Sequence, residues 1–396
     1  PFGATLFDRQ KLRHRYLETP QLGEDIYMSG VKVEGAEHWP ADLTTAPSDL
    51  LYSPIRVYLE TTRECNLRCR HCFNASAKKD PDEMTTDQIV KSLEGMRRDN
   101  IFDVRFTGGE FTIHPDWDSI LKKALDLGFG VSMNTNGVYD DPSIIDKIAD
   151  LGMSLVTVSI EGLKTYHDQI RGKGSFDRSM EALRALYEKG AILRTNTVLT
   201  KGNAQSMEDI IQVVGPYVDE MNFFHMRATG RAQEMRSRAL SYEELDEFNK
   251  QAAQIVQRYP EINILYGSQA TRENSIWTDK LGLRMGGPEG FTRFNLLANG
   301  SMWTGGYVPY IDRNLEMGNI KDEGYTTLRV WRGTPKLDSF REFSRELLLR
   351  CLDCEELDVR CPGINVEMEL VRQKFPDLGN PYCISDQPLP LYPKID

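Results

Sequence analysis

Residues 55–72 read IRVYLETTRECNLRCRHC and join a run of strand-forming residues to three closely spaced cysteines. Residues 55–61 are rich in apolar and β-branched side chains, which predicts a strand, and Cys65, Cys69 and Cys72 follow it directly. In βα barrels the loops that carry function begin at the carboxyl ends of the strands. The three thiols are therefore expected at the functional edge of a sheet.

The sequence after this stretch alternates between strand-like and helix-like patterns. Short apolar or β-branched runs at 104–107, 131–134, 155–160, 193–199 and 221–226 predict five further strands. Helical periodicity predicts helices at 84–99, 115–127, 142–151, 175–189 and 205–218. Strands and helices that alternate over short loops predict a parallel sheet. We expect an α/β fold, a partial (β/α)6 barrel of the TIM type.

The chain is expected to have three parts. Residues 1–52 are polar and interrupted by prolines, which predicts a covering segment rather than a domain. Residues 53–240 hold the barrel. Residues 241–396 begin with a helix near 242–258 and continue with short Gly-rich pieces, including a hairpin at 297–303, which predicts a smaller C-terminal module.

Composition excludes several classes of protein. The 396 residues include 48 Lys and Arg against 59 Asp and Glu, a net charge of −11, which argues against a nucleic-acid partner. The sequence has no apolar run long enough to span a membrane and no secretion leader at its start. Seven cysteines, an odd number in a long chain, do not suggest a disulfide framework. We expect a cytoplasmic protein without a membrane partner.

The first three cysteines can hold one metal centre. Structural zinc requires four ligands in a closed tetrahedron, and His71 would have to bind beside its neighbour Cys72. Three cysteines on a [4Fe–4S] cluster instead leave one iron free for another ligand. A thiol cluster without metal is the remaining reading, and it is disfavoured because adjacent thiolates repel one another.

The remaining four cysteines lie near the end of the sequence, at Cys351, Cys354, Cys361 and Cys383. Four thiolates are a full set of ligands for a single centre. From the spacing alone, a structural zinc ribbon and an iron–sulfur cluster both fit.

Several motifs beyond the first cysteines share their position at predicted strand ends. They are Gly108-Gly109-Glu110, Asn134-Thr135-Asn136-Gly137, Ser159-Ile160-Glu161-Gly162, and then His167-Asp168 and Arg171-Gly172. Together with Cys-x3-Cys-x2-Cys they resemble the radical S-adenosylmethionine (SAM) enzymes over about residues 53–235. The run at 228–232, Ala-Thr-Gly-Arg-Ala, is also similar to that family. The resemblance implies a [4Fe–4S] cluster on the first three cysteines, with SAM as its partner.

The resemblance also implies a role for each motif residue. Gly108 and Gly109 would let the backbone approach the methionyl group, and Glu110 would accept hydrogen bonds from its ammonium. Arg171 would bind the carboxylate of SAM. The ribose hydroxyls would be bound by Ser159, Glu161 and, with weaker support, Asn134. Taken singly, such strand-end residues are often turn or capping residues.

The C-terminal cysteines resemble the auxiliary-cluster extensions of the SPASM and twitch types. The hairpin at 297–303 has no cysteine beside it, and Asn365 stands where that pattern has a further one. The resemblance therefore implies one auxiliary [4Fe–4S] cluster, on Cys351, Cys354, Cys361 and Cys383. The two clusters account for all seven cysteines.

This account leaves no cysteine to return a hydrogen atom to a substrate, which favours net oxidation over epimerisation. No catalytic acid, base or hydrogen donor is assigned. We expect an oxidoreductase of the dehydrogenase type that acts on an amino sugar or aminocyclitol, with an external electron donor such as flavodoxin or ferredoxin. The alternatives are a ribosomal-peptide maturase that forms an oxidative cross-link, a radical epimerase and a zinc-holding scaffold. Residues 1–52 look too short for a leader-peptide domain, which favours the small molecule.

Overall fold

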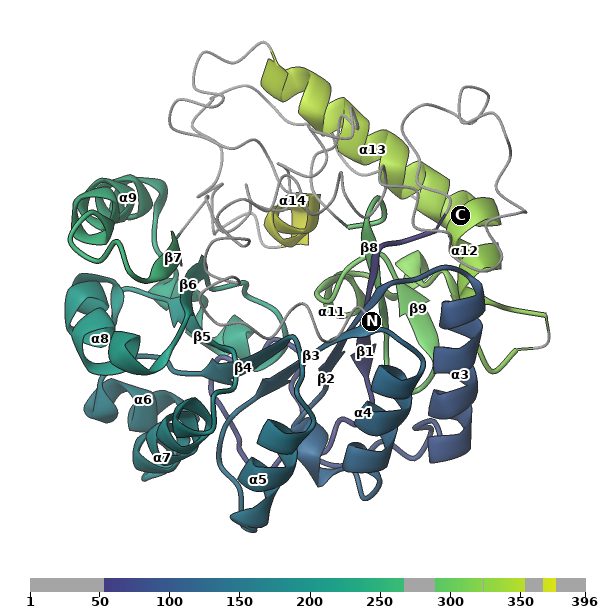
Figure 1. Cartoon of the computed structure of the whole chain (residues 1–396). Helices are drawn as coiled ribbons and strands as arrows, with labels where there is room; N and C mark the ends of the chain where they lie inside the picture. The colour runs from purple at the N-terminus through teal and green to yellow at the C-terminus, as the bar shows by residue number, and fades with distance from the viewer. Residues whose placement is uncertain (1–52, 267–288, 323, 353–365, 375–396) are drawn as a thin grey trace.

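The computed structural model describes residues 53–266, 289–322, 324–352 and 366–374 (Figure 1). These residues form one ten-stranded sheet in the order β10-β9-β8-β1-β2-β3-β4-β5-β6-β7. The strands from β8 through β1 to β7 pair in parallel, and β9 and β10 pair antiparallel at one edge. The fold is therefore an α/β open barrel, as the alternating pattern predicts.

The six predicted strands are all present. They are β1 Arg56–Glu60, β2 Asp103–Thr107, β3 Gly130–Thr135, β4 Leu155–Ser159, β5 Leu193–Leu199 and β6 Glu220–His225. Four strands lie beyond the predicted set of six: β7 Asn263–Tyr266, β8 Arg293–Leu296, β9 Ser301–Trp303 and β10 Gly318–Asn319. The hairpin predicted at 297–303 is the connection from β8 to β9. All four come from the stretch assigned to the C-terminal module, so the sheet itself continues past residue 240.

The predicted helices follow the strands in order. They are α3 Thr86–Arg98, α4 Trp117–Asp126, α5 Ser143–Asp150, α7 Ser175–Glu188, α8 Met207–Val214 and α9 Tyr242–Val256. The helix predicted at 205–218 ends at Val214, because a 3-10 turn over Gly215–Tyr217 contains Pro216, which has no backbone N–H to continue the helix. Helix α6, Lys164–Arg171, was not predicted, since its eight residues are mostly polar.

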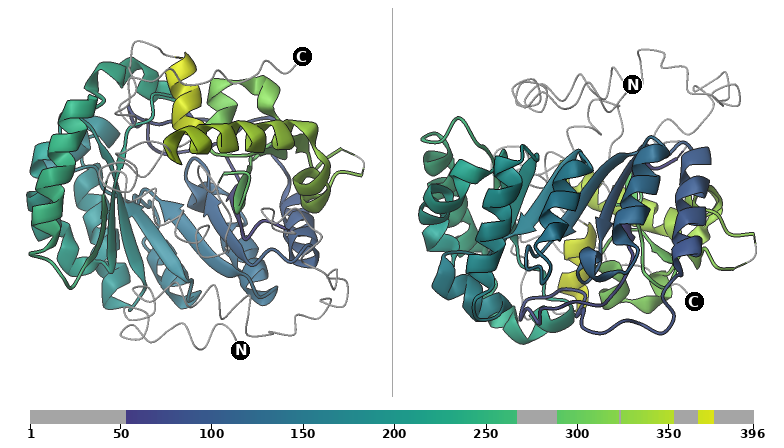
Figure 2. Two further views of the ribbon diagram at one scale, coloured as in Figure 1. Left: turned by 90° about the horizontal axis from the view of Figure 1, so that it is seen from above. Right: turned by 60° about the horizontal axis from the view of Figure 1, so that its bottom comes forward.

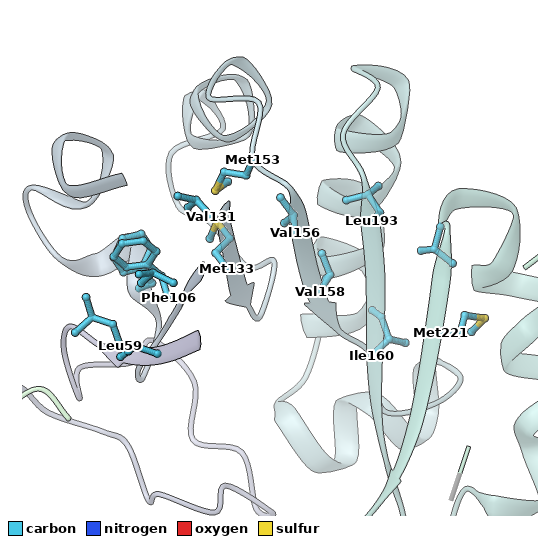
Figure 3. Packing of buried hydrophobic residues seen from close by; sticks show 14 of the residues in the cluster. Leu59, Phe106, Val131, Met133, Met153, Val156, Val158, Ile160, Leu193 and Met221 are labelled. Atoms are coloured by element: carbon cyan, nitrogen blue, oxygen red, sulfur yellow. The ribbon is translucent and has the colours of Figure 1, made fainter. Parts of the chain in front are cut away.

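The sheet has one apolar and one polar face. Successive strand residues point to opposite faces, and Leu59, Phe106, Met133 and Val158 belong to the main buried cluster on the side of helices α3–α8 (Figure 3). Figure 2 shows these helices along one side of the curved sheet. We call the opposite side the concave face. It carries polar residues such as Tyr58, which can bind a ligand rather than pack against helices.

Four helices come from the C-terminal stretch: α11 Val308–Ile311, α12 Thr327–Gly333, α13 Pro335–Leu352 and α14 Val366–Lys374. Of these, α13 and α14 lie over the other side of the sheet from α3–α8, whereas α12 packs beside α3 (Figures 1 and 2). A second buried cluster, which includes Trp303, Phe340, Phe343 and Leu370, joins α13 and α14 to the β9 region. This packing brings α14 towards the loops at the strand ends.

Within the ranges given above, the structure has no helix that is both long and apolar enough to cross a membrane.

Candidate active site

The three cysteines lie on the loop that leaves β1, as the sequence predicts. Cys65, Cys69 and Cys72 are free thiols; Cys69 is buried, and the other two are partly exposed. The loop turns on itself, because the amides of Cys72 and Ala75 bond the carbonyls of Cys69 and Cys72. Burial raises the pKa of the Cys65 and Cys69 thiols, and the cysteines beside them add to the rise. One short loop therefore collects all three sulfurs.

A segment after β6 holds this loop in place. The Arg231 side chain donates hydrogen bonds to the carbonyls of Cys69 (2.8 Å) and Ser76 (2.9 Å), and its amide bonds the carbonyl of Cys72 (2.9 Å). Gly230 has a left-handed φ of 56°, and a Cβ there would lie 2.6 Å from the Cys72 carbonyl oxygen. The stretch at 228–232 thus supports the cysteine loop.

The two glycines at the end of β2 pack against the start of the same loop. The amide of Gly109 bonds the carbonyl of Thr62 (2.8 Å), and the amide of Glu110 bonds that of Glu64 (2.8 Å). A Cβ on Gly108 would lie 2.5 Å from the Thr62 oxygen, and one on Gly109 would overlap the Glu64 oxygen. The close approach that requires glycine here is to the cysteine loop, a contact that the sequence does not reveal.

The Glu110 carboxylate is buried and already has several protein donors. One oxygen accepts from the hydroxyls of Thr112 and Thr135, both at 2.9 Å, and the other accepts from the Asn136 amide at 2.7 Å. Burial raises the pKa of Glu110, and these hydrogen bonds oppose the rise. Glu110 therefore joins the ends of β2 and β3 whether or not it also contacts a ligand.

Glu161 and Arg171 form a buried ion pair beside the cysteines. Arg171 donates from Nε to Glu161 Oε1 (2.9 Å), and its Nη1 lies 3.8 Å from the Cys69 sulfur. His71 Nε2 lies 3.1 Å from the same carboxylate oxygen, and the Val198 amide donates to the other oxygen. Burial alone would raise the pKa of Glu161, but His71 and Arg171 hold it well below its usual value. The predicted carboxylate clamp and ribose ligand are thus bonded to each other.

The other predicted SAM contacts lie on the concave face. Asn134 and Ser159 are partly exposed near the ends of β3 and β4. In the part of the chain that the structure describes, Asn134 Oδ1 and Thr157 Oγ1 are buried oxygens without a hydrogen-bond partner, and the two residues are paired in register. Buried polar atoms usually have partners, so these oxygens fit the hydroxyl or amino donors of a bound ligand.

The C-terminal segment contacts the cysteine loop through aromatic rings. Phe73, which follows Cys72, packs against Tyr307 with 4.6 Å between ring centres and against Tyr310 at 6.1 Å. Arg63 donates to the Tyr310 hydroxyl at 2.8 Å. These contacts join the cysteine loop to the C-terminal segment.

Glu367 of α14 reaches the same region from the C-terminal side. Its carboxylate accepts hydrogen bonds from Arg227 Nη1 (3.0 Å) and from the amide of Tyr307 (3.1 Å). Burial and the neighbouring Glu289 raise the pKa of Glu367 to about 7. The side chain approaches Gly305 so closely that a Cβ there would overlap it. No sequence motif marks Glu367, because its role depends on how α14 packs.

The donor set fits an iron–sulfur cluster. Burial raises the pKa of Cys65 to about 12 and also raises that of Cys69, so their thiolates need a cation. Three N–H groups point at these sulfurs: Leu67 (3.5 Å) and Asn136 (4.0 Å) at Cys65, and Arg171 at Cys69. Among the described residues, no group of three His, Cys, Asp or Glu is placed to hold a single metal ion. In a [4Fe–4S] cluster each cysteine would bind a different iron.

The second set of cysteines is not tested by the structure. Cys351 lies in the last turn of α13, and nothing is described of its side chain. Cys354, Cys361 and Cys383 lie outside the described residues. The auxiliary cluster stays a prediction.

Residues 59–214 match the Radical SAM superfamily, and this range holds the three cysteines, the Gly108–Glu110 turn and the Glu161–Arg171 pair. These residues form a radical SAM domain, the type that binds a [4Fe–4S] cluster and SAM. The chain is 32% identical over 187 residues to the mycofactocin maturase MftC of Mycobacterium tuberculosis, covering 47% of this chain and 48% of that protein. It is 28% identical over 228 residues to an Fe-coproporphyrin III synthase of Methanosarcina barkeri, covering 55% and 57%.

Among solved structures, SuiB of Streptococcus suis bound to its precursor peptide SuiA is similar in fold. The TM-score is 0.66 at 18% identity, over 85% of this chain and 77% of SuiB. The SuiB match shows the fold alone. The chain spans about half the length of the two curated relatives that it matches.

The buried Glu161–Arg171 pair gives a test of the site by stability. Glu161→Gln leaves the Arg171 guanidinium buried without a counter-charge, which we expect to lower the free energy of unfolding by about 3–5 kcal/mol. Denaturant unfolding of the metal-free protein measures this. Asp177→Asn, which breaks the exposed Lys164–Asp177 pair, is the matched control and should change little. If the two substitutions lowered the free energy of unfolding equally, Glu161 and Arg171 would not form a buried ion pair.

Glu367 predicts a pH dependence of stability. Its pKa is about 7 in the folded protein and near the ordinary glutamate value in the unfolded chain, so the folded state binds the proton more tightly. Its contribution is fully present below about pH 4.5 and is lost as the pH rises through 7. We expect Glu367→Gln to retain more of its stability between pH 5 and pH 8 than the wild type, as measured by thermal unfolding. Parallel pH profiles would contradict this.

Proposed function

We propose that this protein is a radical SAM enzyme that modifies a peptide by net oxidation. Cys65, Cys69 and Cys72 would hold the [4Fe–4S] cluster. With SAM bound, the reduced cluster supplies a 5′-deoxyadenosyl radical, which removes a hydrogen atom from an unactivated carbon of the substrate. The barrel residues orient the nucleoside and exclude water from the reaction.

The described residues support specific places for SAM. Asn134, Ser159 and Thr157 offer oxygens on the concave face for the ribose and adenine donors. Arg171 lies beside Cys69 and would bind the carboxylate of SAM, with Glu161 holding the guanidinium in position. Glu110 and the two glycines before it would position the backbone that binds the ammonium group of SAM.

A peptide substrate is favoured by the similarity to SuiB, whose solved complex contains a precursor peptide. That similarity covers 85% of this chain and so extends beyond the radical SAM domain. MftC is named a maturase. The sequence alone favours dehydrogenation of an amino sugar or aminocyclitol, and neither the maturase nor the peptide complex supports that substrate.

The finer chemistry depends on the C-terminal cysteines. Cys351, Cys354, Cys361 and Cys383 would hold a SPASM- or twitch-type auxiliary cluster, which would supply an electron acceptor for the second electron of an oxidative cross-link. An external donor such as flavodoxin or ferredoxin would reduce the first cluster. Both clusters suit a reducing cytoplasm.

Anaerobic incubation with SAM, dithionite and candidate precursor peptides tests the proposal. We expect 5′-deoxyadenosine in proportion to product, and a peptide that has lost about two hydrogens. Deuterium taken up from heavy water at unchanged composition would instead indicate an epimerase. Turnover of an amino sugar but of no peptide would overturn the substrate class. A colourless zinc-containing protein, with far fewer than about eight irons per chain, would indicate the scaffold.

A further inference from the structure

Four polar residues form a row across the concave face, on the neighbouring strands β8, β1, β2 and β3 (Figure 1). Tyr58 is paired in register with Arg105, and Arg105 with Ser132. The Tyr58 hydroxyl accepts from Arg293 Nη1 (3.1 Å) and Arg105 Nη1 (3.4 Å), while Arg105 Nε donates to Ser132 (3.1 Å). We call Tyr58, Arg105, Ser132 and Arg293 the Tyr58 cluster.

The charges of this cluster do not balance. Three neighbouring arginines each have a carboxylate: Arg56 pairs with Asp103, Arg194 with Glu220 and Arg293 with Glu289. Arg105 is only 6% exposed, and it has no ion pair with any carboxylate in the described part of the chain. A buried charge without an ion pair is costly, and a ligand that supplied the opposite charge would reduce that cost.

The cluster lies close to the candidate active site. Glu60, two residues along β1 from Tyr58 and on the same face, accepts a hydrogen bond from Asn74 of the cysteine loop (3.2 Å). Two residues along a strand span about 7 Å. On β3, Ser132 is likewise two residues from Asn134, which has an unpartnered buried oxygen. Tyr58 keeps partial exposure, so this face is reached from solvent.

We propose that the Tyr58 cluster is a carboxylate-binding site that positions an acidic group of the substrate on the concave face, beside the candidate active site. The identification of that substrate as a peptide rests on the proposed function. A carboxylate would bind the Arg105 and Arg293 guanidiniums, with the Tyr58 and Ser132 hydroxyls as further donors. The group is either a side-chain carboxylate or the C-terminus of the peptide.

Ionisation of Tyr58 supplies a readout that needs no turnover. Burial alone would raise the pKa of Tyr58, but Arg105, Arg293, Arg56 and Arg194 together lower it to about 7, so within the cluster the negative charge can come only from the Tyr58 hydroxyl. A bound carboxylate would neutralise the same arginines, so it should raise that pKa. The near-ultraviolet absorbance of tyrosinate, taken as the difference between wild type and Tyr58→Phe, isolates this residue.

The experiment titrates the full-length protein with and without acetate, and with acetamide in matched salt as the neutral control. We expect a midpoint near 7 that saturating acetate raises by about one pH unit and acetamide leaves in place. In Arg105→Gln the midpoint should already be raised, and acetate should no longer move it. N-acetylalanine and the α-amide of N-acetylaspartate then distinguish a terminal from a side-chain carboxylate.

Several results would overturn the proposal. An acetate effect that persists in Arg105→Gln, or no effect at any concentration, would leave Tyr58 as a structural counter-charge. A fall in SAM affinity of tenfold or more in Arg105→Gln would assign the arginine to the carboxylate of SAM instead. Because Arg105 has no paired carboxylate to expose, Arg105→Gln should fold with an unchanged or higher melting temperature, and Arg105→Lys should keep the acetate response.

The two proposals fail separately. The acetate titration needs neither a peptide nor turnover, so a negative result there leaves peptide modification intact. Equally, a protein that turns over no peptide can still bind acetate at the Tyr58 cluster.

Discussion

Cys69→Ser should abolish cleavage of SAM. Cys69 is the buried member of the three thiols, and its sulfur is the one that Arg171 approaches at 3.8 Å. A serine hydroxyl is a far poorer iron ligand than a thiolate, and two cysteines cannot retain a site-differentiated cluster. After anaerobic reconstitution we expect loss of the cluster's absorbance and a drop in 5′-deoxyadenosine of at least about a thousandfold.

Two controls separate loss of the cluster from loss of the fold. Lys122→Ala, an exposed helix residue, should retain full iron content and full cleavage. Cys354→Ser should lose turnover of substrate while retaining more cleavage of SAM, because Cys354 belongs to the second set of cysteines. If Cys69→Ser kept its iron and still formed 5′-deoxyadenosine, the assignment of the first cluster would be wrong.

Gly109→Ala should damage the site through the backbone alone. The new Cβ would overlap the carbonyl oxygen of Glu64 and lie 2.8 Å from that of Arg63. Backbone atoms at the base of the cysteine loop cannot move aside without breaking the Gly109 and Glu110 hydrogen bonds. We expect the free energy of unfolding to fall by about 3 kcal/mol, and reconstituted iron to fall with it.

Gly333→Ala is the matched control. Gly333 is the last residue of α12, and a Cβ there meets nothing within 4 Å. Its stability should be unchanged or raised by about 0.5 kcal/mol, because alanine lowers the entropy of the unfolded chain. If the two variants unfolded at the same denaturant concentration, the close contact with Glu64 would have no energetic importance.

The sequence predicts the strands and helices well because their signals are local. The strand at 193–199 and the helix at 175–189 agree with β5 and α7 almost residue for residue, since apolar periodicity is set by a buried face. The cysteine loop is equally visible, as its ligands are close in sequence. The pairing of β8 with β1 is not visible, because it joins residues more than two hundred positions apart.

The contacts around the site are harder to predict, because they too join residues that are far apart in sequence. Glu161 was expected to meet a ribose, and the structure shows it bonded to His71 and Arg171, which a strand-end motif cannot indicate. The unpaired charge of Arg105 appears only when the carboxylates of the other strands have been assigned to their partners. Asn134 remains a predicted ligand, supported by an oxygen without a partner.

The hydrogen bonds from Arg231 to the carbonyls of Cys69 and Ser76 join positions about 160 residues apart in sequence. A nascent chain that has emerged only as far as β5 already contains all three thiols but lacks the segment that shapes their loop. Iron delivered at that stage would meet a cysteine segment that lacks the hydrogen bonds from Arg231. We therefore expect the cluster to be loaded only after the sixth strand has been synthesised and folded, late in the maturation of each molecule.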